Sequence, residues 1–159
     1  MKELTIIQQA KPAKLEEIEA FERQQSIRLP ADFKQFLISV NPIDVKETFF
    51  VAKDREHWLS QYIPVEKEYW VHAFCPFDES YEMSIQSSHK RLYWHFENRY
   101  LRFAYDAGNW SFVVSVQEKD FGKIYFCRMD QPLEKALALI ADTFEEFIDG
   151  LEIWASDTE

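Results

Sequence analysis

The fold of this protein is decided by a stretch that reads IRLPADFKQFLISVN at residues 27–41. Pro30 suits the first position of a helix because its fixed φ is already helical, and Asn41 before Pro42 predicts the end of that helix. Between them, apolar residues recur at i, i+3, i+4 and i+7 and form one helical face. They are Phe33, Phe36, Leu37 and Val40. The rest of the chain must supply a surface that covers this stripe.

The composition indicates one folded domain, which we predict to span residues 1–159. Hydrophobic residues make up 47% and charged residues 29%, an ordinary globular balance, and the aromatic share of 16% favours strands. No apolar run approaches the roughly 20 residues that a membrane span needs. The apolar patch near the N-terminus is too short for a signal peptide. We therefore expect a cytoplasmic protein whose two cysteines are reduced and buried.

Two further helices are predicted at the ends of the chain. The first runs from Pro12 to about Gln25, with acidic residues in its first turn. The last begins at Thr143, which forms a capping box with Glu146. Its apolar stripe repeats the spacing of the opening stretch and consists of Phe144, Phe147, Ile148 and Leu151.

The region after the second helix changes to a β-like pattern. Thr48–Val51, Tyr69–Cys75, Tyr81–Gln86 and Arg91–Phe96 are predicted to be β-structure, separated by turn-forming residues. Asp54–Tyr62 stays open between a helical turn and a loop.

An antiparallel meander is the clearest β-structure. Its strands are expected at Arg99–Tyr105, Trp110–Val116 and Lys123–Met129. The turns Asp106–Asn109 and Asp120–Gly122 join them, and each contains one of the three glycines.

The order of these elements predicts an α+β fold. We expect a mainly antiparallel sheet of about five or six strands, with two N-terminal helices and a C-terminal helix packed on it. Residues 136–141 fit either a helix or a last strand.

Three separated segments resemble the SUKH superfamily. The most specific is EIEAFE at 17–22 leading into IRLPADFKQFL at 27–37. FGKIYF at 121–126, after the turn at 106–109, is similar to the central strands of that superfamily, and IADTFEEFI at 140–148 resembles its closing capped helix. The chain departs from the family pattern after the second helix, where Asn41 precedes proline instead of glycine.

The resemblance implies a domain that works by binding other proteins. Many bacterial members are immunity proteins that neutralise toxins, often nucleases. Other members are regulators, including yeast cell-wall synthesis regulators and Syd proteins that bind the secretion channel. The family brings no invariant catalytic set, so the resemblance implies neither an enzyme nor a cofactor.

The residues themselves give little support for catalysis or a metal. His72 and Cys75 could join Cys127 on zinc or form a nucleophile pair, but residues three apart in a strand point to opposite faces. We interpret them as ordinary sheet residues.

Residues 89–103 interleave basic and aromatic side chains, as nucleic-acid-binding surfaces do. A hairpin with outward-facing basic residues explains the same composition, and the acidity of the chain argues against nucleic acid.

The net charge of −10 is concentrated in the last third of the chain. Residues 106–159 hold 12 of the 28 acidic residues but only four of the 18 basic ones. Such a surface attracts cationic partners, although a solubilising role explains the same charge. Because a nuclease toxin needs a cationic surface to hold its substrate, an acidic protein can bind that surface and block it.

The predicted partner-binding residues lie in or near the meander turns: Asp106, Asn109, Glu118, Asp120 and Asp130. Glu145, Glu146 and Glu152 have a plain alternative role on the solvent face of the last helix.

Overall fold

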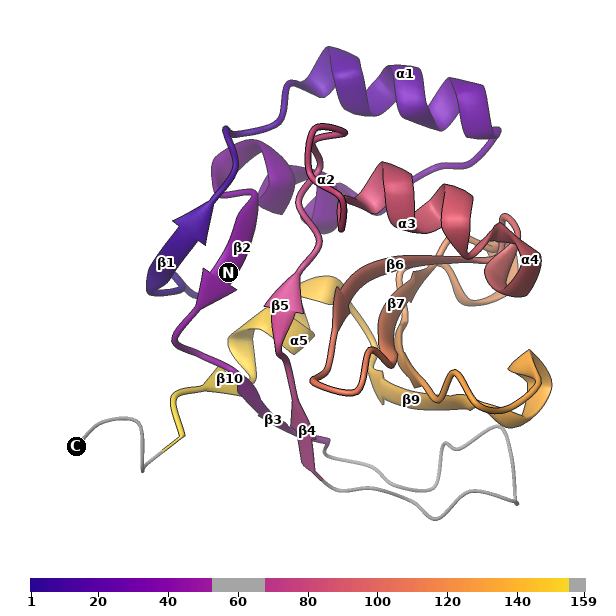
Figure 1. Cartoon of the computed structure of the whole chain (residues 1–159). Coiled ribbons are helices and arrows are strands. Elements are labelled where there is room, and N and C mark those ends of the chain that lie inside the picture. The colour runs from indigo at the N-terminus through magenta and orange to yellow at the C-terminus, as the bar shows by residue number, and fades with distance from the viewer. Residues whose placement is uncertain (53–67, 155–159) are drawn as a thin grey trace.

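A five-stranded antiparallel sheet forms the centre of the molecule in this computed structural model, which describes residues 1–52 and 68–154 (Figure 1). The sheet has the order β5-β6-β7-β8-β9. Its strands are β5 (Ala73–Phe74), β6 (Tyr100–Tyr105), β7 (Ser111–Ser115), β8 (Ile124–Cys127) and β9 (Leu137–Ala141). The predicted meander is therefore confirmed, and residues 136–141 supply a strand, not a helix.

Two smaller antiparallel sheets flank this centre. One pairs β1 (Ile6–Gln9) with β2 (Pro42–Val45). The other has the order β10-β3-β4. Its strands are β3 (Phe49–Val51), β4 (Glu68–Trp70) and β10 (Leu151–Glu152). The α+β class is confirmed, but the segment expected as one strand at Tyr69–Cys75 divides into β4 and β5 in different sheets. The open segment Asp54–Tyr62 lies outside the described residues.

Two helices, α2 (Ala31–Ser39) and α5 (Phe144–Asp149), bury their apolar stripes against one face of the large sheet. The first helix, α1 (Leu15–Gln25), packs on α2, and its Phe21 contacts Phe77 and His89 (Figure 1). Phe33 and Phe36 of α2 each pack against Phe144 of α5, with ring centroids 4.9 Å apart. Phe103 of β6 contacts the same Phe144 ring at 5.2 Å. The stripe at residues 27–41 thus meets the closing helix and the sheet in one aromatic core.

Two buried clusters sandwich the central strand β7. Phe112 and Val114 face the cluster under the helices, whereas Val113 faces a second cluster on the opposite side. The second cluster includes Phe96, Tyr100 and Tyr125. Both faces of β7 are therefore buried, which explains why its serines are fully covered as well.

The first helix begins later than the sequence indicates. The prediction placed its start at Pro12, but α1 starts at Leu15. The amide of Ala13 donates to the carbonyl of Leu37 at 2.9 Å, at the end of α2. Lys14, the N-cap, has an extended backbone with ψ 137°, so residues 12–14 lie before the first helical turn.

The β-structure predicted at Tyr81–Gln86 and Arg91–Phe96 is wrong. Two helices occupy this region, α3 (Ile85–Arg91) and α4 (Tyr93–Phe96). The hydroxyl of Ser84 caps α3 by accepting from the amide of Ser87 at 3.0 Å. Ser87 and Ser88, which with His89 were predicted to form a turn, instead lie in α3. Two single-turn 3-10 helices also interrupt the meander region, at Glu118–Asp120 and Leu133–Lys135.

Candidate protein-binding site

The five predicted partner-binding residues divide between opposite ends of the large sheet. Asp106 and Asn109 lie in the β6–β7 turn, and Asp130 lies at the same end because Ser111 pairs with Cys127. Glu118 and Asp120 lie in the β7–β8 connection at the other end. The five residues of β7 separate the two ends by roughly 17 Å. The structure therefore forms two acidic groups from the predicted set.

At the β6–β7 end, Asp106 shapes the turn. Its Oδ1 accepts hydrogen bonds from the amides of Gly108 at 3.0 Å and Trp110 at 2.8 Å. Asn109 has a left-handed φ of 67°, and its Oδ1 accepts from Nη2 of the buried Arg102 at 2.6 Å. These two side chains thus hold the turn as well as line its surface.

Asp130 is exposed at this end, whereas Asp106 is half-buried. It pairs with Arg128 at 3.4 Å, and the Arg128 guanidinium stacks over the Trp110 ring at 4.5 Å. This stacking fixes Arg128 against the sheet and leaves Asp130 at the rim of the turn, where a partner can reach it.

At the other end, Asp120 and Glu118 differ in their hydrogen bonds and in their exposure. Both oxygens of Asp120 accept hydrogen bonds, one from the Ser115 hydroxyl and the other from the Tyr125 hydroxyl at 2.7 Å. Burial and the neighbouring Asp120 raise the pKa of Tyr125, so this phenol stays a donor. Glu118, in contrast, is exposed on its single-turn helix.

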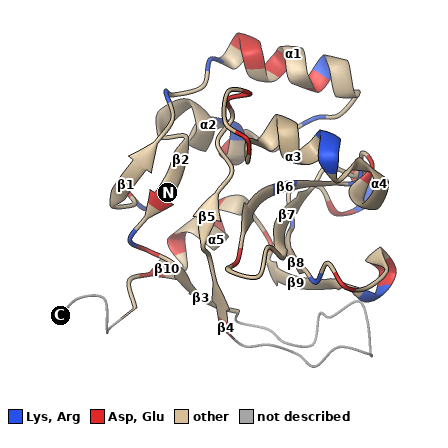
Figure 2. Cartoon of the chain, in the orientation of Figure 1, with Lys and Arg blue, Asp and Glu red and all other residues tan. Residues whose placement is uncertain are grey.

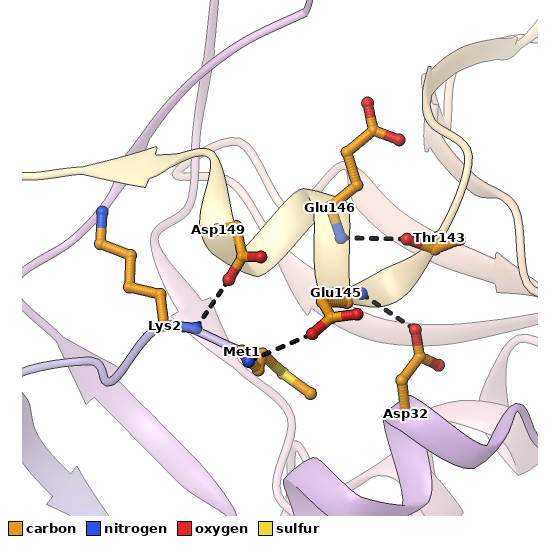
Figure 3. A network of polar contacts seen from close by, with 7 residues as sticks. All are labelled: Met1, Lys2, Asp32, Thr143, Glu145, Glu146 and Asp149. Atoms are coloured by element: carbon orange, nitrogen blue, oxygen red, sulfur yellow. Dashed lines mark hydrogen bonds and ion pairs between the residues drawn. The ribbon is translucent and has the colours of Figure 1, made fainter.

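Acids of α5 hold the N-terminal arm and the start of the helix (Figure 3). The Met1 ammonium pairs with Glu145 at 3.1 Å, and the Lys2 amide donates to Asp149 at 2.6 Å. The Thr143 half of the predicted capping box is confirmed, because the Glu146 amide donates to Thr143 Oγ1 at 3.0 Å. The Glu146 carboxylate, however, accepts from the amide of Asp142 rather than that of Thr143. These carboxylates therefore stabilise the N-terminal arm and the start of α5, in addition to contributing negative charge.

The comparisons with known proteins identify the family. The model of the SMI1 / KNR4 family (SUKH-1) matches residues 12–150. The chain belongs to this family. No curated protein matches the sequence.

The cysteines of this SUKH-1 fold lie in different surroundings. Cys75 lies 4.0 Å from the Ser88 hydroxyl in the cluster under the helices, and Cys127 lies 3.8 Å from His95 Nε2 in the opposite cluster. Burial raises the pKa of Cys75 to about 11 and that of Cys127 to about 12. Both thiols are therefore protonated at neutral pH, which makes them poor nucleophiles.

The part of the SUKH-1 chain that the structure describes contains no candidate metal-binding site. Across residues 1–52 and 68–154, no group of three His, Cys, Asp or Glu side chains is placed to hold a metal ion. No helix within the same ranges is long and apolar enough to cross a bilayer.

The basic and aromatic stretch at residues 89–103 is not a hairpin. It runs from the end of α3 through α4 into β6, and His89, His95 and Phe96 are buried. Arg102 is also buried, with its guanidinium over the Tyr105 ring at 4.6 Å. Its aromatics and bases are thus divided between the core and the surface, which removes the continuous stacking face that single-stranded nucleic acid needs.

Two exposed tryptophans of the SUKH-1 fold escaped the sequence-based prediction. Trp70 on β4 and Trp154 after β10 are 42% and 39% exposed. The signal that could have found them is a repeated tripeptide, EYW at 68–70 and EIW at 152–154, which places a glutamate and a tryptophan on the same face of a strand. Only the sheet pairing shows that the two tripeptides lie on either side of β3.

Proposed function

We propose that this SUKH-1 chain is an intracellular immunity protein that binds a cognate basic toxin, and that it works without chemistry of its own. Membership of the family, which is consistent with immunity or regulatory function, carries this proposal. The net charge of −10 supports the choice of a cationic partner. A nuclease toxin fits this requirement because its substrate-binding surface is basic.

We place the electrostatic contact first at the β6–β7 end of the sheet. Asp130 is exposed there beside the turn of Asp106 and Asn109. At the opposite end, both oxygens of Asp120 are already engaged, so that group depends on Glu118 alone. Charged residues lie mainly on helices and connections, whereas the strands of the large sheet are largely uncharged (Figure 2). We therefore expect the turns, and not the strands, to make the electrostatic contacts with the toxin.

The test is a titration with the basic toxin domain encoded by the neighbouring gene. We expect a 1:1 complex by calorimetry and survival of cells that express both proteins. Asp130→Lys should weaken the complex more than Glu118→Lys, and Glu16→Lys on the exposed side of α1 serves as the matched control. Absence of both a complex and rescue would refute the immunity function.

A regulatory role is the second candidate, because the same family membership is consistent with it. It predicts capture of a host protein and no toxin gene beside this one. Affinity purification from the native cell, compared with co-purification of the neighbouring gene product, separates the two functions.

A further inference from the structure

Three aromatic rings form a cluster on the outer side of the three-stranded sheet. Phe49 contacts Trp70 with centroids 4.6 Å apart and Trp154 at 5.0 Å, and the two tryptophans lie 4.9 Å from each other. Phe49 is nearly buried beneath them, whereas both indoles are exposed. Phe49 is thus the floor of the cluster, and the tryptophans are its surface.

The strand register explains why these rings face outward. Phe49 lies opposite Trp70 on one side and opposite Glu152 on the other, and Trp154 follows Glu152 by two residues. The alternate residues of the same strands point inward and are buried: Phe50, Tyr69 and Leu151. A shift of one residue in this register would expose the core, so the outward position of the tryptophans is strongly specified.

Two carboxylates share the outer side with the rings. Glu68 precedes Trp70 by two residues, Glu152 precedes Trp154 by two residues, and both glutamates are exposed. The ion pairs found among the described residues use neither of them. We call this surface the aromatic face; it consists of Phe49, Val51, Glu68, Trp70, Glu152 and Trp154.

We propose that the aromatic face is a docking surface for an arginine- or lysine-bearing segment of a protein partner, an inference that deepens the binding function proposed above. The face of an indole attracts a guanidinium or ammonium group, and a carboxylate beside it adds a charge-assisted hydrogen bond. Tryptophan is also among the residues that contribute most to binding energy at protein interfaces. The face therefore combines an apolar contact area with selection for positive charge.

The charges on the face decide against a second copy of this chain as the occupant. A symmetric dimer through this face would bring Glu68 and Glu152 of both copies together. Each copy carries a net charge of −10, which adds further repulsion. A basic partner instead neutralises the same carboxylates.

The strand that carries Trp70 leads to the β6–β7 turn, which we assigned to electrostatic contact. His72, two residues after Trp70, donates its amide to the carbonyl of Tyr105 at 2.8 Å. Tyr105 immediately precedes Asp106, the first residue of that turn. One partner can therefore contact the acids and the tryptophans together.

The direct test uses hexa-arginine amide as the probe and the full chain labelled with ¹⁵N. We expect the peptide to shift the indole N–H signals of Trp70 and Trp154 and to leave that of Trp94 in place. Trp154→Ala should weaken binding about 2- to 30-fold, the range expected for loss of a cation–π contact. Glu152→Gln should weaken it about 1.4- to 5-fold, as expected for loss of an exposed ion pair. Trp154→Phe, which keeps an aromatic ring, should retain most of the affinity.

Trp94→Ala is the matched control because Trp94 is 72% exposed on α4, outside the aromatic face. It should change the affinity less than about twofold. Circular dichroism checks that each variant is folded. Equal weakening by Trp94→Ala and Trp154→Ala would overturn the proposal, and so would a wild-type dimer in light scattering that Trp154→Ala dissociates.

The outcomes separate this proposal from the immunity function. A toxin complex whose affinity is unchanged by Trp154→Ala would refute the aromatic face as its docking surface and leave the immunity function standing. Binding of hexa-arginine at this face without any complex with the neighbouring gene product would support the face and refute the immunity function.

Discussion

Asn41 shows how one side chain ends the opening helix and joins it to the rest of the fold. It is fully buried, and its φ of 51° lies in the left-handed region. Its amide nitrogen donates to the carbonyls of Lys11 at 2.8 Å and Phe77 at 3.2 Å, and its oxygen accepts from the Phe77 amide at 2.8 Å. The sequence predicts the helix stop from the following proline but contains no signal for these contacts.

Asn41→Ala should lower the free energy of unfolding by about 2–4 kcal/mol, because it leaves buried backbone groups unpaired and forces alanine into a left-handed conformation. Urea denaturation measures the change. Asn41→Gly is the matched variant, since glycine accepts the conformation and loses only the hydrogen bonds. It should cost about 1 kcal/mol less than Asn41→Ala. Equal stability of Asn41→Ala and wild type would contradict this role.

His89 should make the stability depend on pH. Burial lowers its pKa below the model-compound value of 6.5, against the opposing effect of its 3.1 Å hydrogen bond to Asn98. The unfolded chain then binds a proton more readily than the folded chain, so stability is full above the unfolded pKa and decreases as the pH falls below it. We expect a decrease in the free energy of unfolding from about pH 7.5 to about pH 5.5.

His89→Gln should reduce that pH dependence, and the exposed His72→Gln should leave it unchanged. Part of the dependence should persist in His89→Gln because burial also lowers the pKa of His95. Urea titrations at each pH measure the slope. The same slope in His89→Gln as in wild type would assign the effect to other groups.

At the scale of elements, the junction between α5 and β10 depends on close packing. A Cβ at Gly150 would lie 2.6 Å from Cε2 of Phe50 and 3.3 Å from the carbonyl oxygen of Glu146. The Phe50 ring cannot easily retreat, because it packs on Phe147 with centroids 4.9 Å apart. The sequence indicates a helix end at Gly150, but the need for glycine comes from a strand about 100 residues earlier in the chain.

Gly150→Ala should therefore destabilise the protein by about 1–3 kcal/mol, although alanine is the better helix former. Gly108→Ala is the control, since its nearest neighbour would be Asp106 Oδ1 at 3.6 Å. It should change stability by less than about 0.5 kcal/mol. Thermal and urea denaturation measure both changes. In a Phe50→Leu background the cost of Gly150→Ala should shrink, and an undiminished cost would exclude the ring as its cause.

A comparison of the helices shows which local sequence signals were sufficient to predict them. The stripes of α2 and α5 combine spacing, a start signal and a stop signal, and both helices form where predicted, except that Leu151 of the second stripe lies in β10. At α3 the informative pattern was Ile85, Ser88 and His89, which are buried at i, i+3 and i+4. Two of these three residues are polar, so the pattern does not register as an apolar stripe. The aromatic residues around α4 favoured strands, a preference that tertiary packing overrides.

On the scale of the whole molecule, the charge should control how fast a basic toxin associates. Opposite net charges raise the association rate at low salt, and screening removes that gain. Between about 50 mM and about 500 mM NaCl we expect the association rate constant to fall about tenfold or more, with a smaller change in the dissociation rate constant. Stopped-flow fluorescence measures both.

Asp130→Asn should lower that salt dependence, because it removes a negative charge beside the turn Asp106–Asn109. Trp154→Ala should instead raise the dissociation rate and leave the salt dependence unchanged. An association rate that is independent of salt would contradict electrostatic steering.

The sequence by itself determined the helices with complete start, face and stop signals, the meander, the α+β class and the family. These properties follow from contacts between residues close together in the chain, which local spacing records. The candidate site was only partly predictable. Asp106, Asn109 and Asp130 lie at one end of the sheet and Glu118 and Asp120 at the other, because successive hairpin connections alternate between ends.

Only the tertiary structure decided which surfaces those residues form. The pairing of β3 with both β4 and β10 brings Trp70 and Trp154 onto one ring cluster, although 84 positions separate them. The same pairing sets Phe50 against Gly150. Long-range register depends on the burial of the alternate side chains in a shared core, and no local pattern in the sequence encodes that partner choice.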